Sequence, residues 1–327
     1  MKEIQNLKSK IINGYELTKE EAWKLYEISL YSKEELDTLC NAANEIRQHY
    51  CGDNFDICTI INGKYGRCSE DCKYCAQSVH YPVDTETYSL LDAKQLLEGA
   101  KYNEAKSILR YSVVTSGKTL TNNELDQLCE SYKVLHKNSN ISLCASHGLL
   151  NYEQFVKIKN SGVVRYHNNL ETSRRNFPNI CTTHTYEDKI NTIKAAQKAG
   201  LAVCSGGIMG LGETMEDRIS MAFDLRALGI KSIPINILNP IPHTPFEHNA
   251  ILSVEEVKTI VAVYRFILPD AALRLAGGRG LLADKGRSVF TSGANAAISG
   301  DMLTTSGISI NYDINMIKDL GFKISKL

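Results

Sequence analysis

The sequence has no surplus of charge of either sign and no long apolar run. Its 327 residues include 37 Lys plus Arg and 37 Asp plus Glu, so no net field attracts nucleic acid or an anionic membrane surface. No apolar stretch reaches the length that a membrane-spanning helix needs, and residues 1–5 are too polar to begin a signal peptide. We therefore expect a cytoplasmic protein that acts on a small molecule, with no nucleic-acid partner and no membrane partner.

A disulfide framework is also not expected, although the chain has 10 cysteines. Reducing compartments keep thiols free, so metal sites and buried single thiols remain as explanations. For Cys40, Cys51 and Cys129 we expect inert packing. The sequence assigns no role to Cys181.

Three of the thiols lie close together in a CxxxCxxC pattern formed by Cys68, Cys72 and Cys75. No second CxxC or HxxxH follows to complete a tetrahedral zinc site. Three thiolates leave one iron of a 4Fe-4S cluster without a protein ligand. The pattern therefore predicts an iron-sulfur cluster whose open iron binds a substrate or cofactor, and a structural zinc or thiolate site is the less favoured alternative.

Strand-like runs alternate with helix-like runs along the chain. This alternation predicts an α/β fold, a (β/α)8 TIM-type barrel, in one domain over residues 1–327. Residues 1–52 form an N-terminal helical extension in this prediction. Its residues 19–50, with Thr18 as N-cap, should make two amphipathic helices that wrap or plug the bottom of the barrel. Strands are expected at 55–62, 108–115, 140–145, 163–167, 201–207, 232–238, 272–276 and, more weakly, 294–299. Helices are expected at 92–103, 121–137, 151–161, 185–199, 214–228 and 253–268, with a poorly defined one after residue 286.

Chemically unusual residues fall within several of these strands. Cys58, Ser112, Cys144, Cys204 and Arg274 lie in the first, second, third, fifth and seventh predicted strands. Active sites of such barrels form at the carboxyl ends of the strands. Because side chains alternate in and out along a strand, each of these residues has an even chance of facing inward. Taken singly, each thiol is more simply explained as a packed core residue.

The CxxxCxxC run resembles the radical S-adenosylmethionine superfamily. That resemblance implies that the open iron takes S-adenosylmethionine and that the reduced cluster cleaves it to a 5′-deoxyadenosyl radical. It also implies that Tyr74, beside the last cysteine, packs against the cofactor.

Further runs resemble the biotin synthase family within that superfamily. These runs are YHNNLETS at 166–173, VCSGGIMGLGET at 203–214, SIPIN at 232–236 and LRLAGGR at 273–279. The resemblance implies a homodimeric enzyme that inserts sulfur into dethiobiotin to give biotin. An auxiliary Fe-S cluster donates the sulfur, and an electron donor such as flavodoxin or ferredoxin supplies electrons.

The same resemblance implies roles for single residues. It assigns contacts with S-adenosylmethionine to Tyr74, Asn169, Glu171, Lys189, Gly207, Ile208 and Met209. The carboxylate of Glu171 suits a ribose diol, and a turn at 207–210 should offer backbone and an apolar face to adenine. Lys189 stands where an Arg commonly grips the cofactor carboxylate, and a Lys lacks the bidentate fork. Asn169 is also placed near the substrate, and Asn236 faces its ureido ring.

The auxiliary cluster site departs from the familiar pattern of three cysteines and an arginine. Cys144, Cys204 and Arg274 are kept, but Ser112 stands where the third cysteine is usual. A serine alkoxide is a poor ligand for iron, so we expect Cys58, on the neighbouring strand, to take over. This pattern resembles the variant associated with strict anaerobes, in which a four-iron cluster with an extra sulfide is favoured over a 2Fe-2S cluster. Arg274 is then either a ligand or a hydrogen-bonding neighbour.

The sequence is also compatible with two other functions. One is another radical enzyme of the same subgroup, of the hydrogenase maturase or methylornithine synthase type. The other is a non-catalytic iron-sulfur or zinc protein that acts as a sensor or scaffold. Retention of Cys144, Cys204 and Arg274 with Asn236 favours the biotin synthase resemblance over the first. The presence of cofactor-contact residues around the cluster disfavours the second.

Overall fold

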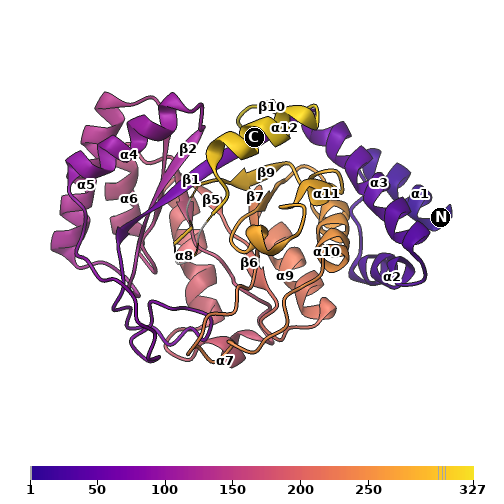
Figure 1. Ribbon diagram of the computed structural model, residues 1–327, viewed down its shortest axis with the longest axis horizontal. Coiled ribbons are helices and arrows are strands. Elements are labelled where there is room, and N and C mark those ends of the chain that lie inside the picture. The colour runs from indigo at the N-terminus through magenta and orange to yellow at the C-terminus, as the bar shows by residue number, and fades with distance from the viewer. Residues whose placement is uncertain (1, 301, 304, 306) are drawn as a thin grey trace.

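Parallel strands close into a barrel in the computed structural model, which describes residues 2–300, 302, 303, 305 and 307–327 (Figure 1). Over these residues, eight strands run in the order β1-β2-β3-β4-β5-β7-β8-β9, and pairing of β1 with β9 closes the ring. Short β6 pairs with β7, and β10 pairs with the start of β1. The predicted TIM-type class is confirmed. The strands are β1 (Asn54–Lys64), β2 (Arg110–Thr115), β3 (Ser142–Ser146), β4 (Arg165–His167), β5 (Ala202–Cys204), β6 (Gly207–Met209), β7 (Ser232–Ile237), β8 (Ala272–Leu275), β9 (Ala296–Ile298) and β10 (Lys323–Ile324).

Helices cover the outside of this barrel (Figure 1). Several begin where the sequence supplies a capping box, as at Asp92, Thr121 and Thr185, whose side chains accept from the third helical N–H. For this reason the predicted boundaries are close to the observed ones. None of the helices in the described part of the chain could span a membrane. The helices are α4 (Ala93–Ala105), α5 (Asn122–Asn138), α6 (Tyr152–Asn160), α7 (Phe177–Ile180), α8 (Tyr186–Lys198), α9 (Met215–Ala227), α10 (Val254–Ile267), α11 (Arg287–Phe290) and α12 (Ile310–Asp319), with a 3-10 turn at Arg279–Leu281.

Three further helices precede the barrel: α1 (Lys2–Ile12), α2 (Lys19–Ser29) and α3 (Lys33–Cys51). The predicted pair is confirmed as α2 and α3, and Thr18 forms the capping box of α2. Helix α1 was not predicted, although Ile4, Leu7 and Ile11 repeat at helical spacing and are buried. Helix α3 packs mainly against α10 and α1, and α2 packs against α10, α3 and α9, so the two helices lie against outer helices beside the barrel and do not plug it (Figure 1).

The predicted strand at 201–207 is also wrong in part, because the chain forms two short strands there. It leaves the sheet after β5 and pairs with β7 again as β6. Gly206 lies between the two strands, so close to β7 that a Cβ atom on it would lie 1.9 Å from the carbonyl oxygen of Pro234. Only glycine fits this contact.

A buried ion pair fixes α12 to the loop after β8. Arg279 donates from Nη1 and Nη2 to the two carboxylate oxygens of Asp313 at 2.9 and 2.6 Å. The two side chains are 2% and 0% exposed. Each charge therefore depends on the other for its stabilisation.

Asp313→Ala should lower the free energy of unfolding by about 3–5 kcal/mol, because it leaves the Arg279 charge buried without its partner. Denaturant unfolding of the purified protein measures this loss. Asp319→Ala removes an exposed carboxylate from the same helix and should change stability by less than about 0.5 kcal/mol. Similar losses for both variants would contradict this account of the pair.

Candidate functional site

A cavity of about 380 Å³ lies inside the barrel and is lined by several of the predicted site residues. Every second residue of several strands lines this cavity, because alternate side chains of a strand point to the same face. These inward pairs include Cys58 and Ile60, Arg110 and Ser112, Cys144 and Ser146, Arg165 and His167, and Pro234 and Asn236. The direction of Cys58, which the sequence left open, is therefore inward.

Three barrel thiols share this wall with Arg274. Cys58, Cys144 and Cys204 come from β1, β3 and β5, and Ser112 on β2 pairs in register with Cys144. Arg274 Nη1 lies 3.2 Å from the Sγ of Cys58 and 3.0 Å from the carbonyl oxygen of Asp56. The fold thus brings together the residues predicted for the auxiliary cluster.

Three arginines, Arg110, Arg165 and Arg274, line one end of the cavity, which we call its floor. The floor carries more positive than negative charge. Asp56 accepts from Arg274 Nη2 at 2.6 Å and from Arg110 Nε at 3.0 Å. Burial opposes ionisation of Asp56, but the two guanidinium groups lower its pKa to about 2. The Nε of Arg165 is buried and has no hydrogen-bond partner among the described residues. The arginines of this floor would stabilise a negatively charged group that is bound to the barrel thiolates.

This cationic floor was not predicted from the sequence. Asp56 lies two residues before Cys58, so strand alternation places both on one face. A carboxylate two residues before Cys58 in the first strand was the signal that could have revealed the floor.

The barrel thiols differ in how easily they ionise. Burial raises the pKa of Cys58 to about 12, with Arg274 opposing the rise and Cys144 and Cys204 adding to it. Burial also opposes ionisation of Cys204, but hydrogen bonding and charge from His167, and then Arg274, lower its pKa to about 6. Ligation to a metal centre requires the thiolate form. Cys204 therefore reaches the thiolate form more readily than Cys58 does.

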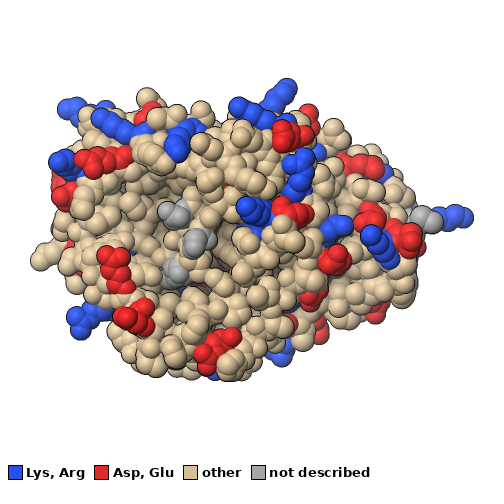
Figure 2. Space-filling view, in the orientation of Figure 1, with Lys and Arg blue, Asp and Glu red and all other residues tan. Residues whose placement is uncertain are grey.

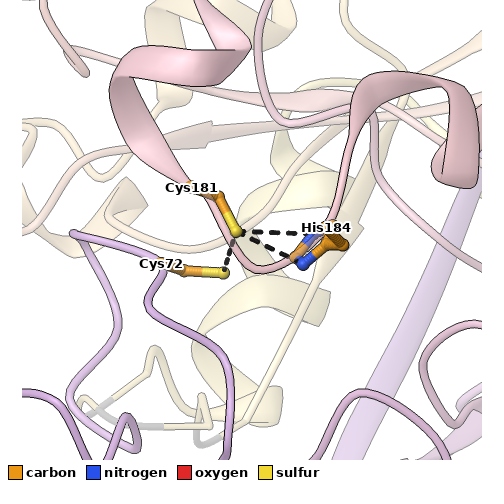
Figure 3. A group of neighbouring side chains, drawn as sticks. All are labelled: Cys72, Cys181 and His184. Atoms are coloured by element: carbon orange, nitrogen blue, oxygen red, sulfur yellow. Dashed lines mark hydrogen bonds between the residues drawn. The ribbon is translucent and has the colours of Figure 1, made fainter.

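The CxxxCxxC loop follows β1 and folds back on itself. The N–H of Cys68 donates to Gln77 O at 2.8 Å, and that of Cys75 donates to Cys72 O at 3.0 Å. Cys68, Tyr74 and Cys75 line the same cavity as the barrel thiols. Cys72 instead directs its Sγ toward Cys181, at 3.7 Å (Figure 3).

Residues predicted to hold S-adenosylmethionine meet at the end of β4. Asn169 Nδ2 donates to Glu171 Oε2 at 3.2 Å, and Asn169 Oδ1 accepts from Gly206 N at 3.1 Å. Both line the cavity, as do Lys189 and Ile208. A carboxylate and an amide are thus held side by side beside the cluster loop.

The predicted turn at 207–210 is wrong, because Gly207, Ile208 and Met209 form β6 against β7. Met209 is 1% exposed and lies in the hydrophobic core. A Cβ atom on Gly207 would lie 2.5 Å from Glu171 O. Glycine therefore lets this strand approach the Glu171 backbone closely.

Asn236 lines the cavity from β7 and already uses part of its amide. Its Nδ2 donates to Gly207 O at 3.0 Å, and its Oδ1 accepts from Gly277 N at 2.9 Å. An amide has a second N–H and a second acceptor position. One donor and one acceptor position of Asn236 remain for a ligand.

Comparison with known proteins identifies the family. Residues 64–225 match the model of the Radical SAM superfamily, and residues 234–323 match that of the Biotin and Thiamin Synthesis associated domain. The chain is 59% identical to the biotin synthase of Clostridium botulinum strain Alaska E43, over 98% of this chain and 99% of that protein. It is 57% identical to the biotin synthase of Akkermansia muciniphila, over 98% of both chains. The chain belongs to the biotin synthase family.

Membership of the biotin synthase family makes this chain a radical S-adenosylmethionine enzyme of the sulfur-inserting type, with a 4Fe-4S cluster. The non-catalytic alternative is therefore wrong. Methylornithine synthase has a similar fold, with a TM-score of 0.83 at 19% identity over 98% of this chain and 97% of that one. The hydrogenase maturase HydG gives 0.84 at 19% identity over 99% and 76%. These two matches show the shared fold alone.

Acidic and basic side chains are interspersed over the face in Figure 2. This distribution agrees with the equal numbers of the two charges in the sequence.

Proposed function

We propose that this chain converts dethiobiotin to biotin by radical sulfur insertion. Cys68, Cys72 and Cys75 would hold the 4Fe-4S cluster, and Cys58, Cys144 and Cys204 would hold the auxiliary cluster. When bound, the first cluster supplies a radical from S-adenosylmethionine and the second supplies sulfur. The observation that carries the proposal is that Cys68, Cys75 and the three barrel thiols line one cavity. Electrons would come from a donor such as flavodoxin or ferredoxin, and the working form would be a homodimer.

The side chains of the protein hold the cofactor between the two sets of cysteines. Glu171 offers two carboxylate oxygens to the ribose hydroxyls, with Asn169 beside it at 3.2 Å. Tyr74 lines the same wall and packs an aromatic ring against the cofactor. Lys189 adds a positive charge for the cofactor carboxylate, as a point charge without a bidentate fork.

The auxiliary site is proposed to hold a four-iron cluster with an extra sulfide rather than a 2Fe-2S cluster. Within the described residues, only Cys72, Cys181 and His184 have three ligand atoms within 4.8 Å of one another. Cys58, Cys144 and Cys204 do not meet this single-ion spacing. Moving the third ligand from β2 to Cys58 on β1 spreads the thiols over β1, β3 and β5, and we expect the reshaped cavity to admit the larger cluster. Arg274, with its two buried contacts to Asp56, is better placed as a hydrogen-bonding neighbour than as a ligand.

The substrate's ureido ring would lie against Asn236. Its free amide N–H and acceptor position match the carbonyl and N–H groups of the ring. The cavity wall next to it is apolar at Ile208, Pro234 and Ile237, which suits the hydrocarbon part of dethiobiotin.

Asn236→Ala should weaken dethiobiotin binding by about 1–3 kcal/mol, because the ureido group would be left unpaired in a buried site. Binding of S-adenosylmethionine should weaken much less. Equilibrium binding of each ligand to the reconstituted protein measures the two effects separately. Because Asn236 also joins Gly207 to Gly277, unfolding curves must show that the variant remains folded. Equal losses for both ligands, or none, would mean that Asn236 does not recognise the substrate.

Turnover of dethiobiotin tests the proposed function. Protein reconstituted anaerobically should form biotin and 5′-deoxyadenosine together when given dethiobiotin, S-adenosylmethionine and a reductant. Mass spectrometry detects both products. Cleavage of the cofactor without any biotin would contradict the proposal and favour another radical reaction of the same superfamily.

A further inference from the structure

Cys72, Cys181 and His184 form a compact group beside the cavity, at the contact between the cluster loop and the segment after α7 (Figure 3). We propose that the cluster-free protein binds a single thiophilic divalent cation, such as zinc, at these three residues. The ion would compete with the iron-sulfur cluster for Cys72. This competition rests on the proposed role of Cys72 as a cluster ligand, whereas binding of the single ion does not.

The spacing of the ligand atoms fits one tetrahedral ion. The Sγ atoms of Cys72 and Cys181 are 3.7 Å apart. The Sγ of Cys181 is 3.3 and 3.8 Å from the two ring nitrogens of His184. Zinc bonds of ordinary length at tetrahedral angles separate two sulfurs by about 3.8 Å and a sulfur from a nitrogen by about 3.6 Å. The two sulfurs are already at this spacing. The imidazole ring must turn to aim Nε2 at the ion, because the Sγ of Cys181 lies nearer to Nδ1 than to Nε2.

Glu70 forms a hydrogen bond with His184 of the kind that orients histidine ligands in metal sites. His184 Nδ1 lies 2.6 Å from Glu70 Oε2, and the two side chains are 6% and 8% exposed. We assign the Nδ1 proton to this hydrogen bond, which leaves the lone pair of Nε2 for the ion. A carboxylate that accepts from the far nitrogen orients a histidine ligand and raises its basicity. Thr183 Oγ1 donates to the same carboxylate oxygen at 2.8 Å and helps to fix Glu70.

Backbone contacts bring the two segments together without any metal. Lys73, which follows Cys72, donates from its N–H to the carbonyl oxygen of Ile180, which precedes Cys181, at 2.9 Å. Asp71 accepts from the N–H of Thr182 at 2.8 Å and from that of Thr183 at 3.2 Å. Its Oδ1 also lies 3.2 Å from the Sγ of Cys181. Asp71 or a water could thus provide a fourth ligand, and the two segments are held together before an ion binds.

Occupation of this site has a consequence for cluster assembly. Binding an ion takes the protons off Cys72 and Cys181 and commits the Cys72 thiolate. Only Cys68 and Cys75 of the CxxxCxxC motif then remain for the cluster. Zinc should therefore retard assembly of the 4Fe-4S cluster, and removal of Cys181 should relieve that effect while leaving all three motif thiols in place.

The binding test must separate this site from one made by the three motif thiols. The double variant Cys68→Ala/Cys75→Ala removes the competing motif site but keeps the proposed one. Cluster-free double variant, titrated anaerobically with zinc against a chromophoric chelator, should keep one tight equivalent. X-ray absorption at the zinc edge should show two sulfurs at about 2.3 Å and one imidazole nitrogen at about 2.0–2.1 Å.

Further substitutions in the same background should weaken that equivalent. Glu70→Gln should lower zinc affinity about 10–100-fold, and Cys181→Ala or His184→Ala should lower it more. Cys129→Ala, which removes a buried thiol from α5, is the matched control and should leave affinity unchanged. Loss of tight zinc in the double variant, or full affinity after Cys181→Ala and His184→Ala, would overturn the proposal.

Cluster reconstitution provides a second test that uses the full chain. With equimolar zinc present, the wild-type protein should incorporate iron at the motif more slowly than without zinc, as followed by visible absorbance and iron analysis. Cys181→Ala should incorporate iron at nearly the zinc-free rate. Equal inhibition of both proteins would contradict competition for Cys72.

Discussion

Replacing Cys72 with alanine is expected to abolish reductive cleavage of S-adenosylmethionine. Two remaining thiolates, Cys68 and Cys75, do not hold the cluster whose open iron takes the cofactor. Formation of 5′-deoxyadenosine under reducing, anaerobic conditions measures this step without requiring biotin formation.

Cys181→Ala is the matched control, because it removes the thiol 3.7 Å from the Sγ of Cys72 but leaves the CxxxCxxC motif intact. It should retain cofactor cleavage. Substantial 5′-deoxyadenosine from Cys72→Ala, or loss of cleavage in both variants, would contradict the assignment of Cys72 to the radical cluster.

Cys58→Ala is expected to lose the auxiliary cluster and biotin formation while it still cleaves S-adenosylmethionine. Two four-iron clusters give about eight irons per chain after reconstitution, so this variant should retain about four. Iron and sulfide analysis measures the loss, and product analysis separates the two activities.

Ser112→Ala tests the other possible ligand on the neighbouring strand. Its hydroxyl lines the same cavity, but a serine oxygen is a poor ligand for iron, so iron content should change little. Full iron in Cys58→Ala together with loss in Ser112→Ala would show that the proposed exchange of ligands is wrong. About six irons in the unaltered protein would instead favour a 2Fe-2S auxiliary cluster.

The barrel could be predicted because local signals agree along the chain. Apolar strands alternate with helices that begin at capping boxes, such as those of Asp92 and Thr121. The break between β5 and β6 could not be predicted in this way. It depends on the contact of Gly206 with Pro234, a residue from a later strand.

The sequence predicted which residues form the candidate site but not how they are oriented in it. Strand alternation relates Cys58 to Asp56, yet it does not say which face points inward. The closed barrel shows it, because Cys58 lines the internal cavity. No role was predicted for Cys181, because its partner Cys72 lies 109 residues away along the chain. Only the folded loops bring these two thiols and His184 together.

The source of the sulfur tests the central claim most directly. The protein should be reconstituted anaerobically with iron and isotopically labelled sulfide, freed of unbound sulfide, and given dethiobiotin, S-adenosylmethionine and a reductant. We predict that the first biotin formed carries the label, and that Cys58→Ala forms none while it still releases 5′-deoxyadenosine. Unlabelled biotin, or labelled biotin from Cys58→Ala, would contradict a sulfur-donating cluster held by Cys58, Cys144 and Cys204.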